Sequence, residues 1–178
     1  PRSMVLLRHY QMSFREARNS ERVAGIPFTD QNGKMPQSKL VSIIIRTKNE
    51  ERWIGSCLRS VSQQDYPNFE IILVDNESDD QTVKKAEQYD VKITHIEKFL
   101  PGKAINQGIR ESSGQIIVCL SGHCIPVAND WLSNLVRDLE DSNVGGVYGR
   151  QEPLSFSSDY DKRDLLTVFG LDKKVQRR

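Results

Sequence analysis

Residues 40–75 read LVSIIIRTKNEERWIGSCLRSVSQQDYPNFEIILVD, and this stretch decides the fold class. Two runs rich in Val and Ile, at 40–45 and 69–74, have the length and composition of buried strands. The residues between them repeat apolar side chains at helical spacing, which predicts an amphipathic helix. Its apolar positions are Trp53, Cys57, Leu58 and Val61. A strand, a helix and a second strand in this order predict a parallel pair joined by a right-handed crossover.

The same alternation continues along the chain. It predicts strands at 91–96, 115–120 and 144–148, and helices at 81–89, 104–112 and 131–139. The expected fold is α/β: a Rossmann-like, three-layer, open and mainly parallel sheet with helices on both faces. We expect this domain to cover residues 40–158. Residues 1–39 form a polar, basic extension, for which a linker is one interpretation, and residues 159–178 form a basic tail.

Composition and charge limit the kinds of partner and the cellular compartment that we expect for this protein. The 178 residues carry a net charge of +1, but the basic ends leave the middle of the chain mildly acidic, which argues against a nucleic-acid partner. We find no stretch long and apolar enough for a membrane span. Three cysteines form neither a disulfide framework nor a CxxC pair, so we expect a cytoplasmic protein. The basic tail allows peripheral contact with the inner membrane surface.

Polar clusters follow three of the predicted strands. They are Arg46-Thr47-Lys48-Asn49-Glu50, Asp75-Asn76-Glu77-Ser78-Asp79-Asp80 and Ser121-Gly122-His123-Cys124. In open α/β sheets, ligands bind outside the carboxyl ends of the strands, so we expect these clusters to share one crevice. Their side chains carry carboxylate, amide, cationic and imidazole groups. Such groups can bind a ribose, a base and a diphosphate, whereas an apolar ligand would have few contacts with them.

Two longer stretches make a resemblance specific. Both resemble family 2 glycosyltransferases with the GT-A fold. The first covers residues 40–82 and ends YPNFEIILVDNESDDQT, and the second covers residues 102–132 and reads GKAINQGIRESSGQIIVCLSGHCIPVANDWL. The similarity covers roughly residues 40–151. The segment Tyr148-Gly149-Arg150-Gln151 is similar to a bacterial branch that builds surface polysaccharides.

This resemblance implies an enzyme that moves a sugar from a nucleotide-diphosphate donor to a hydroxyl acceptor, a glycan or a lipid-linked one, with inversion. In the family, a carboxylate base lies well after the fifth strand. Here that direction offers Asp159, Asp161, Asp164 and Asp172, none in a matching motif, so the catalytic residue is unknown. We therefore expect these 178 residues to be the nucleotide-binding half of a longer protein, with residues 159–178 beginning its acceptor side.

The resemblance also assigns binding roles. Asp75 would accept hydrogen bonds from the nucleoside, and Asn76 would touch the base. Thr47 and Asn49 would line the nucleotide pocket, while Glu50 would fix the loop or the start of the helix. The diphosphate and donor sugar would be bordered by Lys103 and Asn106.

One departure concerns the metal. Family members carry Asp-x-Asp after the fourth strand, where this chain has Ser121-Gly122-His123. Loss of two carboxylates weakens a Mg²⁺ site, although an imidazole still ligates Mn²⁺. Either His123 holds a weakly bound divalent cation, which we favour, or Arg46, Lys48 or Lys103 neutralises the phosphates.

Structural interpretations compete with each role. Asn49 could simply be the N-cap of the following helix, and Glu50 could lie in its first turn. Asp75 could simply stabilise the turn after its strand. A lone histidine such as His123 is often structural, and zinc held by His123 and Cys124 is disfavoured because further ligands are missing. A catalytically inactive GT-A-like binding module is the alternative function. A nucleotidyltransferase is disfavoured because residues 46–50 contain no glycine.

Overall fold

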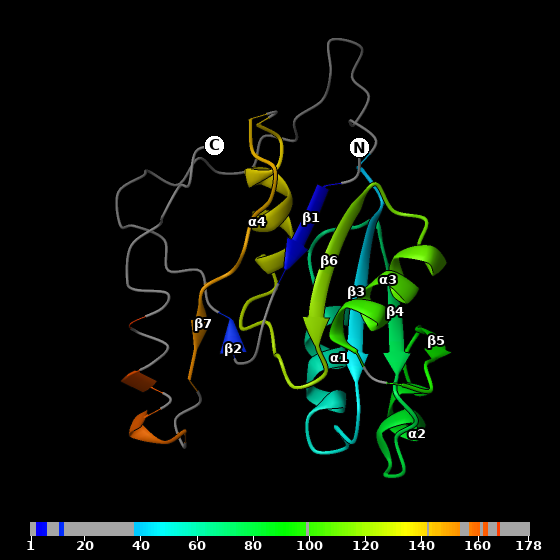
Figure 1. Ribbon diagram of the computed structural model, residues 1–178. Helices are drawn as coiled ribbons and strands as arrows, with labels where there is room; N and C mark the ends of the chain where they lie inside the picture. Colours follow the sequence, from blue (N-terminus) through cyan, green and yellow to red (C-terminus); the bar gives the residue numbers. More distant parts are fainter. Residues whose placement is uncertain are drawn as a thin grey trace.

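The computed structural model describes residues 3–6, 11–12, 38–98, 100–141, 143–153, 157–160, 162–163 and 167. Its main sheet has five strands in the order β1-β6-β3-β4-β5, and every neighbouring pair is parallel. The strands are β1 (Ser3–Leu6), β3 (Val41–Thr47), β4 (Phe69–Asp75), β5 (Lys92–His95) and β6 (Ile116–Ser121). In Figure 1 the arrows of β1, β6, β3 and β4 all point downward, so their carboxyl ends form one edge.

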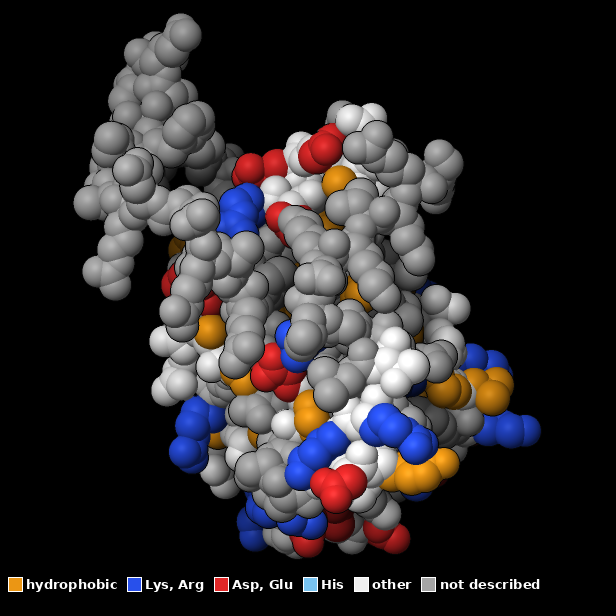
Figure 2. All heavy atoms as spheres, turned by 90° about the vertical axis from the view of Figure 1, so that its left-hand side faces the viewer, with side chains coloured by type: hydrophobic (Ala, Val, Ile, Leu, Met, Phe, Trp, Pro, Cys, Tyr) orange, Lys and Arg blue, Asp and Glu red, His pale blue; other side chains and the backbone are white. Residues whose placement is uncertain are grey.

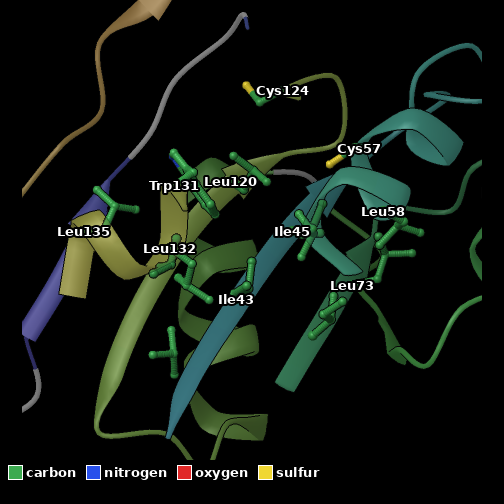
Figure 3. Packing of buried hydrophobic residues seen from close by; sticks show 14 of the residues in the cluster. Ile43, Ile45, Cys57, Leu58, Leu73, Leu120, Cys124, Trp131, Leu132 and Leu135 are labelled. Atoms are coloured by element: carbon green, nitrogen blue, oxygen red, sulfur yellow. The ribbon is translucent and has the colours of Figure 1, made fainter. Parts of the chain in front are cut away.

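Helices cover both faces of this sheet. They are α1 (Ile54–Ser62), α2 (Thr82–Ala86), α3 (Pro101–Glu111) and α4 (Trp131–Asp138). One face, which carries Ile43 and Ile45, packs against α1, α2 and α4 (Figure 3). The opposite face, which carries Ile44, packs against α3. Alternate residues of each strand thus serve two cores, which explains why the strands read as continuous apolar runs.

The predicted three-layer α/β fold is confirmed. Four of the five expected strands are present within two residues of the expected ends, and all four expected helices form. Among the described residues, none of the helices combines the length and the apolar character needed to cross a bilayer.

The sequence pattern places residues 1–39 in an extension before the domain, whereas residues 3–6 belong to the main sheet. This segment forms β1, the edge strand beside β6, with Ser3 opposite Ile116 and Leu6 opposite Cys119. The apolar run Met4-Val5-Leu6-Leu7 is too short, and too close to arginines, to stand out in the sequence. Residues 13–37 lie outside the described part of the chain, as do most of residues 159–178.

The strand expected at 144–148 is wrong. Residues 144–150 have no regular structure, and the next strand is β7 (Gln151–Glu152), which pairs antiparallel with β2 (Gln11–Met12) in a separate two-stranded sheet. Gly145 and Gly146 interrupt the apolar run, and glycine weakens a strand because it gives up more backbone freedom and packs no side chain. Figure 2 views the molecule from the β2 and β7 side, where described Lys and Arg side chains lie among Asp and Glu.

Candidate functional site

The ends of β6, β3 and β4 lie next to one another at the carboxyl edge of the sheet. Thr47 pairs with Asp75 in the β3–β4 register, and Arg46 pairs with Ser121 in the β3–β6 register. Backbone hydrogen bonds continue past the strands, from Asn76 N to Thr47 O at 3.0 Å and from Gly122 N to Arg46 O at 3.0 Å. The three polar clusters therefore lie at one edge of the sheet, and the crevice expected between them stays a prediction.

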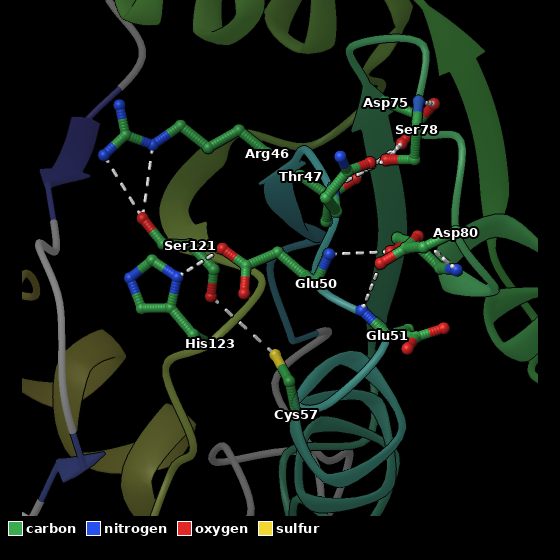
Figure 4. A network of polar contacts seen from close by, with 12 residues as sticks. Arg46, Thr47, Glu50, Glu51, Cys57, Asp75, Ser78, Asp80, Ser121 and His123 are labelled. Atoms are coloured by element: carbon green, nitrogen blue, oxygen red, sulfur yellow. Dashed lines mark hydrogen bonds and ion pairs between the residues drawn. The ribbon is translucent and has the colours of Figure 1, made fainter.

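Asp75 is buried and held by internal donors. Its side chain is 1% exposed, and Oδ1 accepts hydrogen bonds from Thr47 Oγ1 at 3.1 Å and from Ser78 Oγ at 2.6 Å. Oδ2 accepts the Ser78 N–H at 2.9 Å and lies 3.6 Å from His95 Nδ1. This carboxylate braces the loop that follows β4 (Figure 4).

Asn76, the next residue, is 4% exposed. Its side-chain Oδ1 is buried and has no hydrogen-bond partner within the described ranges. A buried carbonyl oxygen without a donor costs free energy, and such groups are rare in folded proteins. Asn76 therefore offers an acceptor that no described residue of the chain uses.

Glu50 and His123 join the loops after β3 and β6. Nδ1 of His123 lies 2.5 Å from Oε1 of Glu50, and both side chains are about one-fifth exposed, at 21% and 18%. The Glu50 amide donates to Thr82 Oγ1 at 2.7 Å, so the first residue of α2 also holds this loop. The resemblance-based role of Glu50, fixing the loop, agrees with these contacts.

Gly122 permits this close approach. A Cβ atom at residue 122 would lie 2.7 Å from Thr47 Cγ2 and 3.2 Å from Glu50 Cγ. Real Cβ atoms do not approach neighbours that closely, so a larger residue would push the β6 loop away from the β3 loop.

Asn49 links the β3 loop to the β4 loop. Its amide donates to Ser78 Oγ at 2.9 Å, and its Oδ1 accepts the Asp79 N–H at 3.1 Å. Its φ is 54°, in the left-handed region that asparagine tolerates better than most residues. Because α1 begins at Ile54, the interpretation of Asn49 as its N-cap is wrong, and Glu50 precedes the first helical turn.

A second carboxylate on this edge is also engaged. Asp80 accepts hydrogen bonds from the amides of Thr82, at 2.8 Å, and Glu51, at 3.0 Å. Burial raises the pKa of the Asp80 carboxyl, but hydrogen bonds from Thr82 and Glu51 outweigh it and leave the pKa below its usual value. Asp80 is thus ionised near neutral pH and fixes the start of α2.

Two cations flank the strand ends. Arg46 donates from both Nε and Nη2 to Ser121 Oγ, each at 3.2 Å, and Lys48 Nζ donates to the backbone oxygen of Asn76 at 3.0 Å. Neither forms a salt bridge with another described residue.

The remaining predicted residues lie on α3. Lys103 and Asn106 are exposed, whereas Ala104 and Gly108 of the same helix face the sheet. In the described part of the chain, no hydrogen bond connects Lys103 or Asn106 to the strand-end loops. Their assigned roles stay predictions.

These side chains do not form a carboxylate-held metal site. The described residues contain no group of three His, Cys, Asp or Glu side chains that could hold an ion. The Ser121 hydroxyl is bound by Arg46, and one nitrogen of His123 is bound by Glu50. Burial raises the pKa of the Cys57 thiol well above its usual value, and the neighbouring Cys124 and Glu50 add to this rise. Mg²⁺ prefers carboxylates and water, and this set does not fit it. Ligation by His123 stays a prediction.

Sequence reasoning missed Ser78, His95 and Thr82 as partners of the predicted residues. Ser78 follows Asp75 at a spacing typical of a side-chain-capped turn, which is a signal that local sequence contains. His95 ends the strand beside β4, so its place follows from strand order. Thr82 had no such signal, because its contact with Glu50 depends on how α2 docks.

Comparison with known proteins agrees with this geometry. Residues 42–174 match the family model described as glycosyl transferase family 2. Glycosyltransferase AglE of Haloferax volcanii is 35% identical over 120 residues, which cover 63% of this chain and 39% of that protein. A dolichyl N-acetyl-α-D-glucosaminyl phosphate diacetamido-dideoxy-glucuronosyltransferase of Methanococcus voltae is 34% identical over 123 residues, or 61% and 38%. The chain thus spans about two-fifths of the length of these relatives.

Solved structures share the fold. A mannosyltransferase of Pyrobaculum calidifontis, in complex with GDP-Man and Mn²⁺, superposes with a TM-score of 0.56 at 27% identity, covering 71% of this chain and 37% of that one. TarS of S. aureus, in complex with UDP-GlcNAc, gives 0.52 at 26% identity, covering 57% and 31%. The sheet is that of the GT-A fold, and the chain belongs to glycosyl transferase family 2.

Proposed function

We propose that this chain binds a nucleotide-activated sugar at the carboxyl edge of its sheet and serves an enzyme that transfers the sugar to a hydroxyl acceptor. Family membership supports the reaction class. The observation that carries the location is the convergence of the β3, β4 and β6 loops, which are tied together by Thr47–Asp75 and Glu50–His123.

Asn76 is our candidate for contact with the base. Its buried Oδ1 has no partner in the described part of the chain and would accept a hydrogen bond from a nucleobase N–H. Asp75 and Thr47 would act mainly by positioning, because they already bond to each other. Asn49 would hold the β3 and β4 loops in place around the nucleoside.

The phosphates would lie toward the β3–β6 side of the edge. Arg46, bound to Ser121, and His123, bound to Glu50, place positive and polar groups there. Gly122 lets the β6 loop lie close against Thr47 and Glu50. Lys103 and Asn106 on α3 would border the diphosphate and the sugar.

The proposed chemistry is an in-line displacement with inversion. The acceptor oxygen forms a bond to the anomeric carbon while the bond to the nucleotide phosphate breaks, and a carboxylate base takes the acceptor proton. Preorganised cations would stabilise the charge on the departing phosphate. We assign no residue of this chain as the base.

The acceptor is proposed to be a glycan or a lipid-linked saccharide. The Methanococcus voltae relative is named for a dolichyl-phosphate-linked sugar, and the S. aureus relative for poly(ribitol-phosphate). We further propose a cytoplasmic location. Cys57, Cys119 and Cys124 are buried and form no disulfide, which suits a reducing compartment.

A second candidate is a binding module of the same fold without catalytic activity. Replacement of Asp-x-Asp by Ser121-Gly122-His123 favours it. Binding of a donor together with hydrolysis or transfer of its sugar would support the enzyme, whereas binding without turnover in the full-length protein would support the module.

Calorimetry with UDP-, dTDP-, GDP- and CMP-linked sugars tests the proposal. We expect one nucleotide class to bind, and Asn76→Ala to weaken that binding. A matched control is Gln88→Ala, an exposed position after α2 that should leave affinity unchanged. Failure of every donor to bind would contradict the proposal.

A further inference from the structure

Among the described residues, no acidic side chain forms a salt bridge with the cations at the strand ends. Arg46 is half-buried, and its described contacts are the two hydrogen bonds to the Ser121 hydroxyl, which is neutral. A partly buried charge that is paired with no acid loses hydration without full compensation. This arrangement is unusual enough to require a partner.

Acids close to Arg46 are engaged elsewhere. Glu50 binds His123, and Asp75 accepts from Thr47 and Ser78 (Figure 4). Within the described ranges, therefore, the counter-charge of Arg46 is not supplied by the chain, and an external anion would supply it.

The guanidinium also contacts the residue at which the resemblance places the first metal-binding carboxylate. Ser121 occupies that position of the motif, and Arg46 contacts its hydroxyl with two N–H groups. The nearby Cys119 thiol responds to the same charge: burial raises its pKa to about 11, and the positive charge of Arg46 opposes that rise. A cation fixed at this point would repel a divalent metal rather than assist in holding one.

We propose that Arg46, oriented by Ser121, replaces the divalent cation as the group that binds the nucleotide diphosphate, so that donor binding does not require metal. This inference rests on the proposed function. A guanidinium suits the task because its planar set of donors matches phosphate oxygens and stays charged at any physiological pH. Lys48 would assist by fixing the Asn76 backbone.

The first experiment needs no substitution. Titrate the 178-residue protein with UDP, GDP, dTDP and CDP by calorimetry, once in EDTA and once in Mn²⁺. We expect the nucleotide that binds to do so with the same affinity in both buffers. Binding in Mn²⁺ alone would overturn the inference and leave the proposed function standing. If none of the four bound in either buffer, the proposed function would fall, and the inference with it.

Replacing Arg46 tests whether this residue contacts the phosphates of the nucleotide rather than its nucleoside. Arg46→Gln should weaken binding of the nucleoside diphosphate about tenfold or more, the usual cost of losing a charged hydrogen bond. Binding of the corresponding nucleoside should change little. Arg59→Gln, an exposed position of α1, is the matched control, and a circular dichroism melt checks folding. Equal losses for nucleoside and diphosphate would show a structural role instead and contradict the inference, and so would unchanged diphosphate affinity.

Discussion

His123 Nδ1 and Glu50 Oε1 lie 2.5 Å apart and tie the loop after β6 to the loop after β3. The imidazole stands at a motif position where the resemblance leads us to expect a carboxylate, and its partner is an acid that precedes α1. One consequence is that a carboxylate at residue 123 would face Glu50 directly.

His123→Asp should therefore destabilise the protein in EDTA, because two carboxylates at this separation repel each other. We expect a loss of about 1–3 kcal/mol in the free energy of unfolding, partly recovered when Mn²⁺ neutralises the pair. Thermal melts of variant and wild type, with and without Mn²⁺, measure both effects. Equal stabilisation of the wild type by Mn²⁺ would contradict the account of this pair.

Gly122→Ala tests the close approach of the β3 and β6 loops. The added Cβ would meet Thr47 Cγ2 at 2.7 Å, so we expect a loss of about 1–3 kcal/mol in stability and weaker nucleotide binding. Gly55→Ala is the control, because nothing lies within 4 Å of a Cβ there and alanine is the better helix former. Urea unfolding compares the two. Similar stability for both variants would show that the loops move apart easily.

Replacing Asp75 by alanine should lower the stability of the protein, whereas replacing Asn76 by alanine should not. Asp75→Ala removes an acceptor from the buried Thr47 hydroxyl and from Ser78, so it should cost about 2–3 kcal/mol of stability. Asn76→Ala removes an unsatisfied buried carbonyl, so stability should hold or rise while nucleotide affinity falls about tenfold. Urea unfolding and calorimetry on both variants measure this. A large stability loss for Asn76→Ala with unchanged affinity would contradict the assignment.

The alkaline pH dependence of stability has a defined sign. Burial raises the pKa of Cys119 to about 11 in the folded protein, whereas an unfolded thiol titrates near pH 8.5. The folded state keeps the proton longer, so this thiol's contribution is complete below about pH 8.5 and declines as pH rises toward 11. Cys119→Ala should remove about 2 kcal/mol of the decline seen in the wild type between pH 8.5 and 11. Identical profiles for the two proteins would show that the thiol is accessible to water.

Much of the fold followed from local sequence. Runs such as Ile43–Ile45 and Ile71–Val74 are buried on both faces, and that pattern predicted a parallel sheet before any contact was known. The rule that parallel strands end at one edge then brought Thr47, Asp75 and Ser121 together correctly. These features depend on periodicity and chain order.

Other features depend on tertiary contacts. β1 forms because β6 offers an unpaired edge, and four residues of sequence do not reveal it. The hydrogen bonds of Thr47 to Asp75 and of Arg46 to Ser121 required the relative placement of side chains from separate strands. The motif suggested which residues belong to the site, but the structure was needed to see which of their polar atoms already have partners.

The central claim is that the strand-end loops bind an activated sugar, and amide chemical shifts of the ¹⁵N-labelled protein test it most directly. On titration with UDP-GlcNAc or GDP-mannose, we predict shift changes at residues 46–50, 75–80 and 121–123, including the side-chain amide of Asn76. Changes confined to other parts of the chain, or none with either donor, would contradict the claim.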